Sequence, residues 1–172
     1  MKNAPIFFIT PIVLGNSPSA NGLNFMYAIL MQTFLGPKQE GFKDGSVNYR
    51  GPEFREATLM IQELYDKGYI NPDNASIPFF MDSLETFKAG KAGFTIGLAS
   101  DVGHWKDFGE ALGNDTVLDK MNGTTYPSYA SFLPSGVEND VMALMYQYFI
   151  SKEMSLDAYI DAAERIYRSS LQ

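Results

Sequence analysis

The stretch GPEFREATLMIQELYDKGYINPD, residues 51–73, predicts a helix that ends at a defined turn. Pro52 stands at the first helical position, where its missing N–H costs nothing. Apolar residues then recur at helical spacing and form one stripe: Phe54, Ala57, Ile61, Leu64 and Tyr65. Gly68 occupies the position that takes a left-handed backbone after a helix, and Pro72 prevents a restart. We therefore expect a helix over about residues 53–67, followed by a fixed turn.

Strands flank this helix on both sides in the sequence. The β-branched and aromatic run at residues 6–14 predicts a buried strand, although Lys2 and the small residues after the run superficially resemble a signal peptide. Pro5 and Pro11 favour the strand. Residues 92–96 predict a second buried strand, and a polar loop follows each strand. Alternation of strands and helices indicates an α/β fold.

Further helices are expected before and after these strands. Residues 25–35 are apolar nearly all round, with Asn24 as the expected N-cap, and residues 37–50 read as a polar connector. Shorter helices are expected at Asp82, where the spacing is similar to a capping box, and around Trp105. The chain ends in two helices, at residues 140–150 and 156–168, the second with Ser155 as N-cap.

Composition excludes several classes of protein. The 172 residues, 45% hydrophobic and 14% aromatic, fit one globular domain. The net charge is −7 and the basic residues are scattered, so neither nucleic acid nor an anionic membrane is an expected partner. The chain has no cysteine, which removes disulfides, thiolate metal sites and a lipid-anchor cysteine.

Catalytic and metal-binding motifs are missing from the sequence. There is no G-x-S-x-G, H-E-x-x-H, P-loop or G-x-G-x-x-G pattern, and no motif supports the single histidine, His104, as a base. The acidic pair Asp157 and Asp161 fits an exposed helix face. Residues 44–45 and 71–74 only weakly resemble calcium loops. No metal and no cofactor is expected.

Small polar and amide side chains gather in the loops after the two strands. Carboxylate, amide and hydroxyl groups, together with an aromatic platform, suit the paired donors, acceptors and C–H faces of a sugar. We expect these residues to form a carbohydrate site at the ends of neighbouring strands, with Trp105 either stacking on the sugar or packing in its own helix. The candidates are Asn16, Ser17, Asn21, Asn24, Ser100, Asp101, His104 and Trp105.

The order of motifs adds a family resemblance. GPEFRE at residues 51–56, ELYDKGYINP at 63–72 and FKAGKAG at 87–93 are followed by Ile96-Gly97 and Asp101. Over about residues 5–117 the sequence resembles the extracellular solute-binding proteins, family 1, which deliver sugars to bacterial ABC transporters. The resemblance implies a helix-rich α/β lobe of the periplasmic-binding-protein type II kind with a small central sheet. It also implies an extracellular or periplasmic location, an ABC permease as partner, and no catalysis.

The sequence departs from the family pattern at two places. Ser100 stands where many relatives have a sugar-stacking Trp. Family members also begin with an N-terminal lobe, and residues look deleted between Val117 and Leu118. We therefore expect residues 1–172 to form a single lobe, truncated relative to the family. Residues 1–117 would form the hinge strand and lobe core, and residues 118–172 an irregular segment and two helices.

Three functions remain open at this stage. The first is a sugar-binding component, or a fragment of one. The second is a remnant lobe that binds no ligand and self-associates, for instance as a homodimer, through apolar surface on residues 25–35. The third, an enzyme, has no motif in its favour and would require loss of some turnover on mutation of His104.

Overall fold

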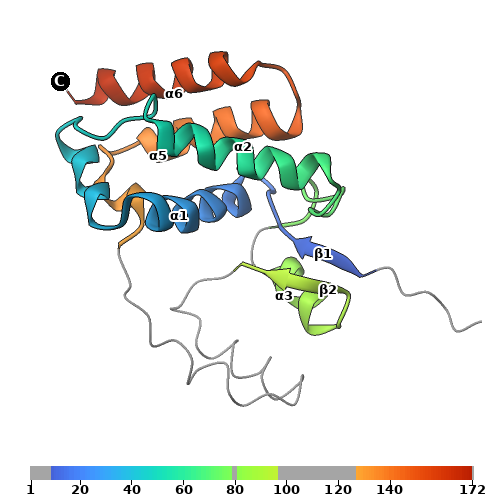
Figure 1. Ribbon diagram of the computed structural model, residues 1–172. Helices are drawn as coiled ribbons and strands as arrows, with labels where there is room; N and C mark the ends of the chain where they lie inside the picture. The colour runs from blue at the N-terminus through green and yellow to red at the C-terminus, as the bar shows by residue number, and fades with distance from the viewer. Residues whose placement is uncertain (1–8, 79–80, 97–126, 172) are drawn as a thin grey trace, which may run out of the picture.

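The computed structural model describes residues 9–78, 81–96 and 127–171. Within them, four longer helices lie together, and a two-stranded sheet with one short helix lies at one end (Figure 1). The fold is a helix-rich α/β fold with a small sheet, as the sequence predicts. Its elements are β1 (Thr10–Val13), α1 (Asn21–Leu35), the 3₁₀ helix η1 (Gly36–Lys43), α2 (Pro52–Asp66), α3 (Met81–Lys88), β2 (Ala92–Thr95), the 3₁₀ helix η3 (Tyr129–Phe132), α5 (Val137–Met145), the π-helical η4 (Tyr146–Ile150) and α6 (Leu156–Ser170).

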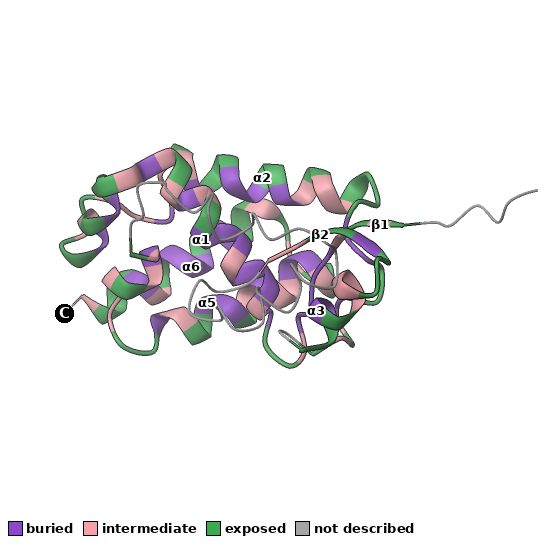
Figure 2. Cartoon of the chain, turned by 90° about the horizontal axis from the view of Figure 1, so that it is seen from below, coloured by how far each residue is buried: buried purple, intermediate pink, exposed green. Residues whose placement is uncertain are grey.

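Aromatic side chains fill the space between the helices. Helix α1 contacts α2 and α5, and α6 contacts α5, so each helix buries one face (Figure 2). Tyr27 of α1 stacks on Phe54 of α2 with ring centroids 5.0 Å apart, and Tyr148 stacks on Tyr159 at 5.0 Å. Full burial of a large apolar side chain contributes about 1.5–3 kcal/mol. Packing of this aromatic core therefore holds the four helices together.

Helix α2 confirms the prediction made from residues 51–73. It begins at Pro52 and ends at Asp66, and the predicted stripe includes the buried residues Phe54, Ala57 and Ile61. Gly68 has a φ of +67°, the left-handed conformation that a side chain would strain. Its N–H donates to the carbonyl of Tyr65 at 2.9 Å, which closes the helix.

The predicted start of α1 is wrong. The helix begins at Asn21, and Asn24 lies inside its first turn instead of capping it. The position before the helix is Ala20, which has no side-chain cap. Instead, Asn16 in the preceding loop accepts the Leu23 N–H through its Oδ1 at 2.9 Å. A first-turn N–H is thus satisfied by a residue outside the helix.

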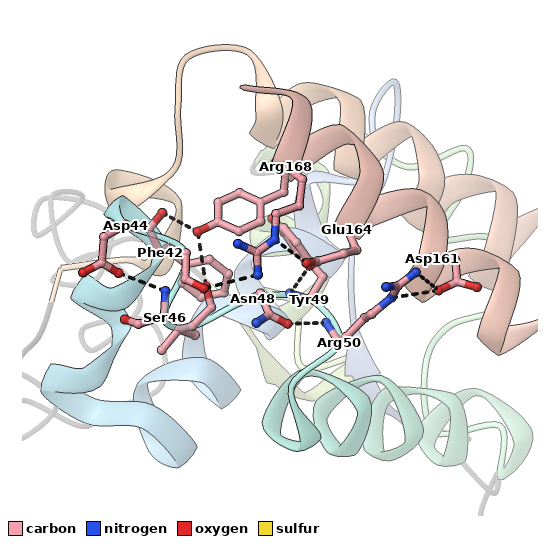
Figure 3. A network of polar contacts seen from close by, with 12 residues as sticks. Phe42, Asp44, Ser46, Asn48, Tyr49, Arg50, Asp161, Glu164 and Arg168 are labelled. Carbon is pink, nitrogen blue, oxygen red and sulfur yellow. Dashed lines mark hydrogen bonds and ion pairs between the residues drawn. The ribbon is translucent and has the colours of Figure 1, made fainter. Parts of the chain in front are cut away.

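The polar connector expected at residues 37–50 is only partly correct. It contains η1, and the side chains of Phe42 and Tyr49 are completely buried. Helix α6 supplies the partners: the Tyr167 hydroxyl donates to the Phe42 carbonyl at 2.6 Å, and Glu164 Oε2 accepts the Tyr49 N–H at 3.0 Å (Figure 3). The segment is therefore a docked part of the core.

Other boundaries differ in smaller ways. Strand β2 packs against α3 but is not fully buried, since the Phe94 side chain is 70% exposed. Helix α5 begins at Val137 instead of Asp140, and Asp82 lies within the first turn of α3. Helix α6 confirms its prediction: Ser155 caps it by accepting the Ala158 N–H at 3.2 Å.

Candidate functional site

The two strands are parallel, which brings the segments after them to one edge of the sheet. Residue Ile12 of β1 pairs with Phe94 of β2, and on its other side forms a parallel bridge with Ile70. The carboxyl ends of parallel strands share one edge, a common place for ligand contacts. Residues 14–20, here called the first loop, and residues 71–78, the second loop, both leave from this edge.

The candidates divide between described and undescribed parts of the chain. Asn16, Ser17, Asn21 and Asn24 belong to the first loop or to the start of α1. The candidates after β2 lie outside the described residues: Ser100, Asp101, His104 and Trp105. That five of them line one concave face at the ends of the neighbouring strands stays a prediction: Asn16, Asn21, Ser100, Asp101 and Trp105. The parallel pairing of β1 and β2 is the geometry that this prediction requires.

Asn16 lies in the protein interior with its side chain fully engaged. Its exposure is 0%. Its Oδ1 accepts the Leu23 N–H, and its Nδ2 donates to Asn74 Oδ1 at 2.8 Å and to the Tyr65 hydroxyl at 3.4 Å. A buried amide with these partners stabilises the loop that holds it. Asn16 is thus a buried support of the first loop.

Asn24 is engaged in a similar way between α1 and the C-terminal helices. Its Nδ2 donates to Glu138 Oε1 at 2.6 Å, and its Oδ1 accepts the Tyr129 hydroxyl at 3.0 Å. Burial raises the pKa of the Tyr129 hydroxyl well above its usual range, so this donor keeps its proton. The contacts join α1 to α5 and to η3.

Ser17 and Asn21 are the candidates with accessible surface in the described part of the chain. Both are half-buried, and they flank Pro18 and Ser19, which are exposed. The Ser17 backbone N–H donates to the Ile77 carbonyl at 3.0 Å, and Asn21 Nδ2 donates to Ser19 Oγ at 3.2 Å. Both side chains therefore keep polar groups that are partly accessible to a ligand.

The ionisable groups of α6 have a structural role. Asp161 Oδ1 accepts a hydrogen bond from Arg50 Nη2 at 2.8 Å (Figure 3), and Asp157 Oδ1 accepts one from Arg55 Nη1 at 2.8 Å. Both acids thus form ion pairs with α2 or with the residues just before it. Within the described residues, no cluster of three or more acidic or histidine side chains could hold a metal ion. None of the described helices is long and apolar enough to cross a membrane.

Three residues, Asn71, Asn74 and Tyr65, hold the two loops together and were not among the candidates from the sequence. Asn71 Oδ1 accepts the Leu14 N–H at 2.7 Å, and Asn74 Oδ1 accepts the Tyr65 hydroxyl at 3.0 Å. Both asparagines are buried. The available signal was the density of amides in residues 71–74 directly after a helix stop, which we interpreted only as a weak calcium loop.

An apolar groove opens between α1 and α2. Its volume is about 270 Å³, and Ile96, the residue after β2, is one of its lining residues. Three of its large apolar side chains are markedly exposed: Ile29 (51%), Met60 (43%) and Tyr69 (43%). The ion pair between Lys67 and Glu63 lies at its rim. Exposed apolar surface of this kind is typical of an interaction site.

Comparison with known proteins shows the fold. No family model and no curated protein matches the sequence. A chitin oligosaccharide binding protein matches with a TM-score of 0.70 and 16% identity, over 95% of this chain and 60% of that one. A sugar transporter from Bacillus licheniformis in complex with stachyose matches with a TM-score of 0.59 and 14% identity, over 96% and 62%. The chain therefore has the fold of these sugar-binding proteins and spans about three fifths of their length.

Proposed function

We propose that the protein is a non-catalytic carbohydrate-binding component of an ABC sugar-uptake system, in the family 1 group of extracellular solute-binding proteins. The observation that supports this most is the fold, which matches two sugar-binding proteins over 95% and 96% of the chain. The motif order of residues 51–101 supports the same family independently. The proposal includes an extracellular or periplasmic location and delivery of the sugar to a membrane permease.

The proposed sugar site lies at the carboxyl edge of β1 and β2. Ser17 and Asn21 contribute from the first loop and α1, while Asn16 and Asn24 support them from the interior. The residues after β2 complete the site in this proposal: Ser100, Asp101, His104 and Trp105. Sugars are recognised by several directed hydrogen bonds plus an apolar face, and this set offers both.

Isothermal titration calorimetry with stachyose and with chitin oligosaccharides tests the proposal. We expect saturable heat with at least one of them. The double variant Ser17→Ala, Asn21→Ala should weaken that binding, because each hydroxyl or amide contact contributes about 0.5–1.5 kcal/mol. Asn139→Ala is a matched control, since Asn139 is exposed on α5. Wild-type protein that binds neither these nor any other sugar in a panel of mono- and oligosaccharides would refute the function.

The alternative function is a self-associating module without a sugar ligand. The groove between α1 and α2, with exposed Ile29, Met60 and Tyr69, is the observation that favours it. A second copy would bury this apolar surface. Light scattering coupled to size-exclusion chromatography separates the two functions. A dimer that Ile29→Asp converts to a monomer, without any sugar binding, would support the alternative.

A further inference from the structure

The first and second loops are joined by hydrogen bonds along their length. The Asn16 N–H donates to the Asn74 carbonyl at 2.8 Å, and the Asn16 side chain donates to Asn74 Oδ1 at 2.8 Å. The Ser17 N–H donates to the Ile77 carbonyl at 3.0 Å, and Ser17 also forms a parallel bridge with Pro78. Backbone and side-chain contacts thus hold the candidate sugar-binding loop against its neighbour.

A third asparagine anchors this pair of loops to the sheet. Asn71 Oδ1 accepts the Leu14 N–H at 2.7 Å, directly where β1 passes into the first loop. Asn74 Nδ2 donates to the Asn71 carbonyl at 2.7 Å, so the two asparagines of the second loop also hold each other. Asn71 Nδ2 donates to Asp73 Oδ1 at 2.9 Å. Each amide group of Asn16, Asn71 and Asn74 both donates and accepts.

Tyr65 closes the network from α2. Its hydroxyl donates to Asn74 Oδ1 at 3.0 Å, and its ring stacks on Phe149 with centroids 5.8 Å apart. Burial raises the pKa of this hydroxyl well above its usual range, which keeps it a donor. The network therefore extends from the helical core to the first loop.

We infer that Asn16, Asn71 and Asn74 form a clamp that fixes the first loop in its ligand-binding conformation, and that they are positioning residues. This inference rests on the proposed sugar-binding function. The asparagines are 0%, 4% and 5% exposed, so they act through Ser17 and Asn21 and not by contact with a sugar. A loop that is fixed before binding loses less conformational entropy when the ligand arrives, which favours affinity.

Amide hydrogen exchange of the free protein tests the clamp without any ligand. In Asn74→Ala, the exchange rates of the Leu14 and Leu23 amides should rise about fivefold or more, the factor that corresponds to one hydrogen bond of about 1 kcal/mol. The Met31 amide, farther along α1, should keep its rate. Equal acceleration at all three amides, or none at Leu14 and Leu23, would overturn the clamp. If Asn74→Ala does not fold, Tyr65→Phe removes one bond to Asn74 Oδ1 and tests the same amides.

Calorimetry tests the positioning role. The ligand is the sugar that binds the wild type, taken from stachyose, the chitin oligosaccharides and the panel of mono- and oligosaccharides. Asn74→Ala should raise its Kd about fivefold or more, the factor that again corresponds to about 1 kcal/mol. The control Asn139→Ala should leave Kd unchanged. An unchanged Kd in a variant with faster loop exchange would overturn the positioning role and leave the sugar-binding function intact. Absence of binding by the wild type would overturn the function itself, and the positioning role with it.

Discussion

Glu164 of α6 is expected to be the acidic residue of that helix on which stability depends most. Its side chain is 7% exposed, and its Oε2 accepts the buried Tyr49 N–H at 3.0 Å (Figure 3). Its Oε1 accepts Arg168 Nε at 2.7 Å. Because Tyr49 lies in the segment between η1 and α2, the carboxylate ties that segment to α6. Glu164→Ala leaves the Tyr49 N–H without this acceptor.

The expected loss follows from that single buried contact. A hydrogen bond to a charged group contributes about 1.5–3 kcal/mol, and its loss also leaves a buried donor unsatisfied. Loss of the contact with Arg168 should not change the free energy of unfolding further, because the Arg168 side chain is 47% exposed and water replaces the contact. The free energy of unfolding should therefore fall by about 2–3 kcal/mol, which lowers the urea midpoint by about 1 M.

Asp161 is the matched control on the same helix. It pairs with Arg50 at 2.8 Å, but the two side chains are 57% and 61% exposed. Exposed pairs contribute at most about 1 kcal/mol, so Asp161→Ala should change the urea midpoint far less. Unfolding of both variants followed by circular dichroism gives the comparison. Equal losses in the two variants, or a loss under about 1 kcal/mol for Glu164→Ala, would refute the role of the buried contact.

Three further predictions concern the core and the groove. Tyr27→Phe removes a hydroxyl that donates to Thr58 Oγ1 at 2.8 Å, so the free energy of unfolding in urea should fall by about 1 kcal/mol. Tyr49→Phe should leave it unchanged or raise it, because the buried Tyr49 hydroxyl has no partner among the described residues. Burial raises the pKa of Tyr129, so the folded state keeps a proton that the unfolded state loses at high pH. The contribution of Tyr129 to the free energy of unfolding is therefore present below about pH 10 and is lost as pH rises further. In Tyr129→Phe, the free energy of unfolding measured against pH should fall less steeply above about pH 10. Ile29→Asp should leave the unfolding midpoint nearly unchanged, because Ile29 is 51% exposed, and a large decrease would show that the groove is part of the core.

Helices whose ends depend on local residues could be predicted from the sequence. Pro52 and Gly68 determine where α2 begins and ends, and Ser155 does the same for the start of α6. In each case the deciding residue lies within one turn of the boundary it sets. The two strands and the α/β class were predicted, but the parallel pairing of β1 with β2 was not, because it depends on contacts between residues about 80 positions apart.

Boundaries and burial that depend on distant partners could not be predicted. The start of α1 is set by Asn16, which belongs to the loop before the helix. The segment around Phe42 and Tyr49 is polar in composition, and its burial depends on Glu164 and Tyr167 of α6. The sequence separation in the Tyr49–Glu164 contact is 115 residues, so no local pattern contains it.

The same distinction separates the candidate site into two kinds of polar residue. Sequence shows that amides follow a strand, but it does not show whether each amide faces a ligand or the protein. Asn16 meets Asn74 across a separation of 58 residues and Asn24 meets Glu138 across 114, and both are buried by these contacts. Ser17 and Asn21, between them in sequence, keep accessible surface. A rigid support and an accessible polar edge are both needed for a site that binds without a large ordering cost. The interior asparagines therefore belong to the proposed site as its support, and substitutions there should weaken binding without removing a single contact to the sugar.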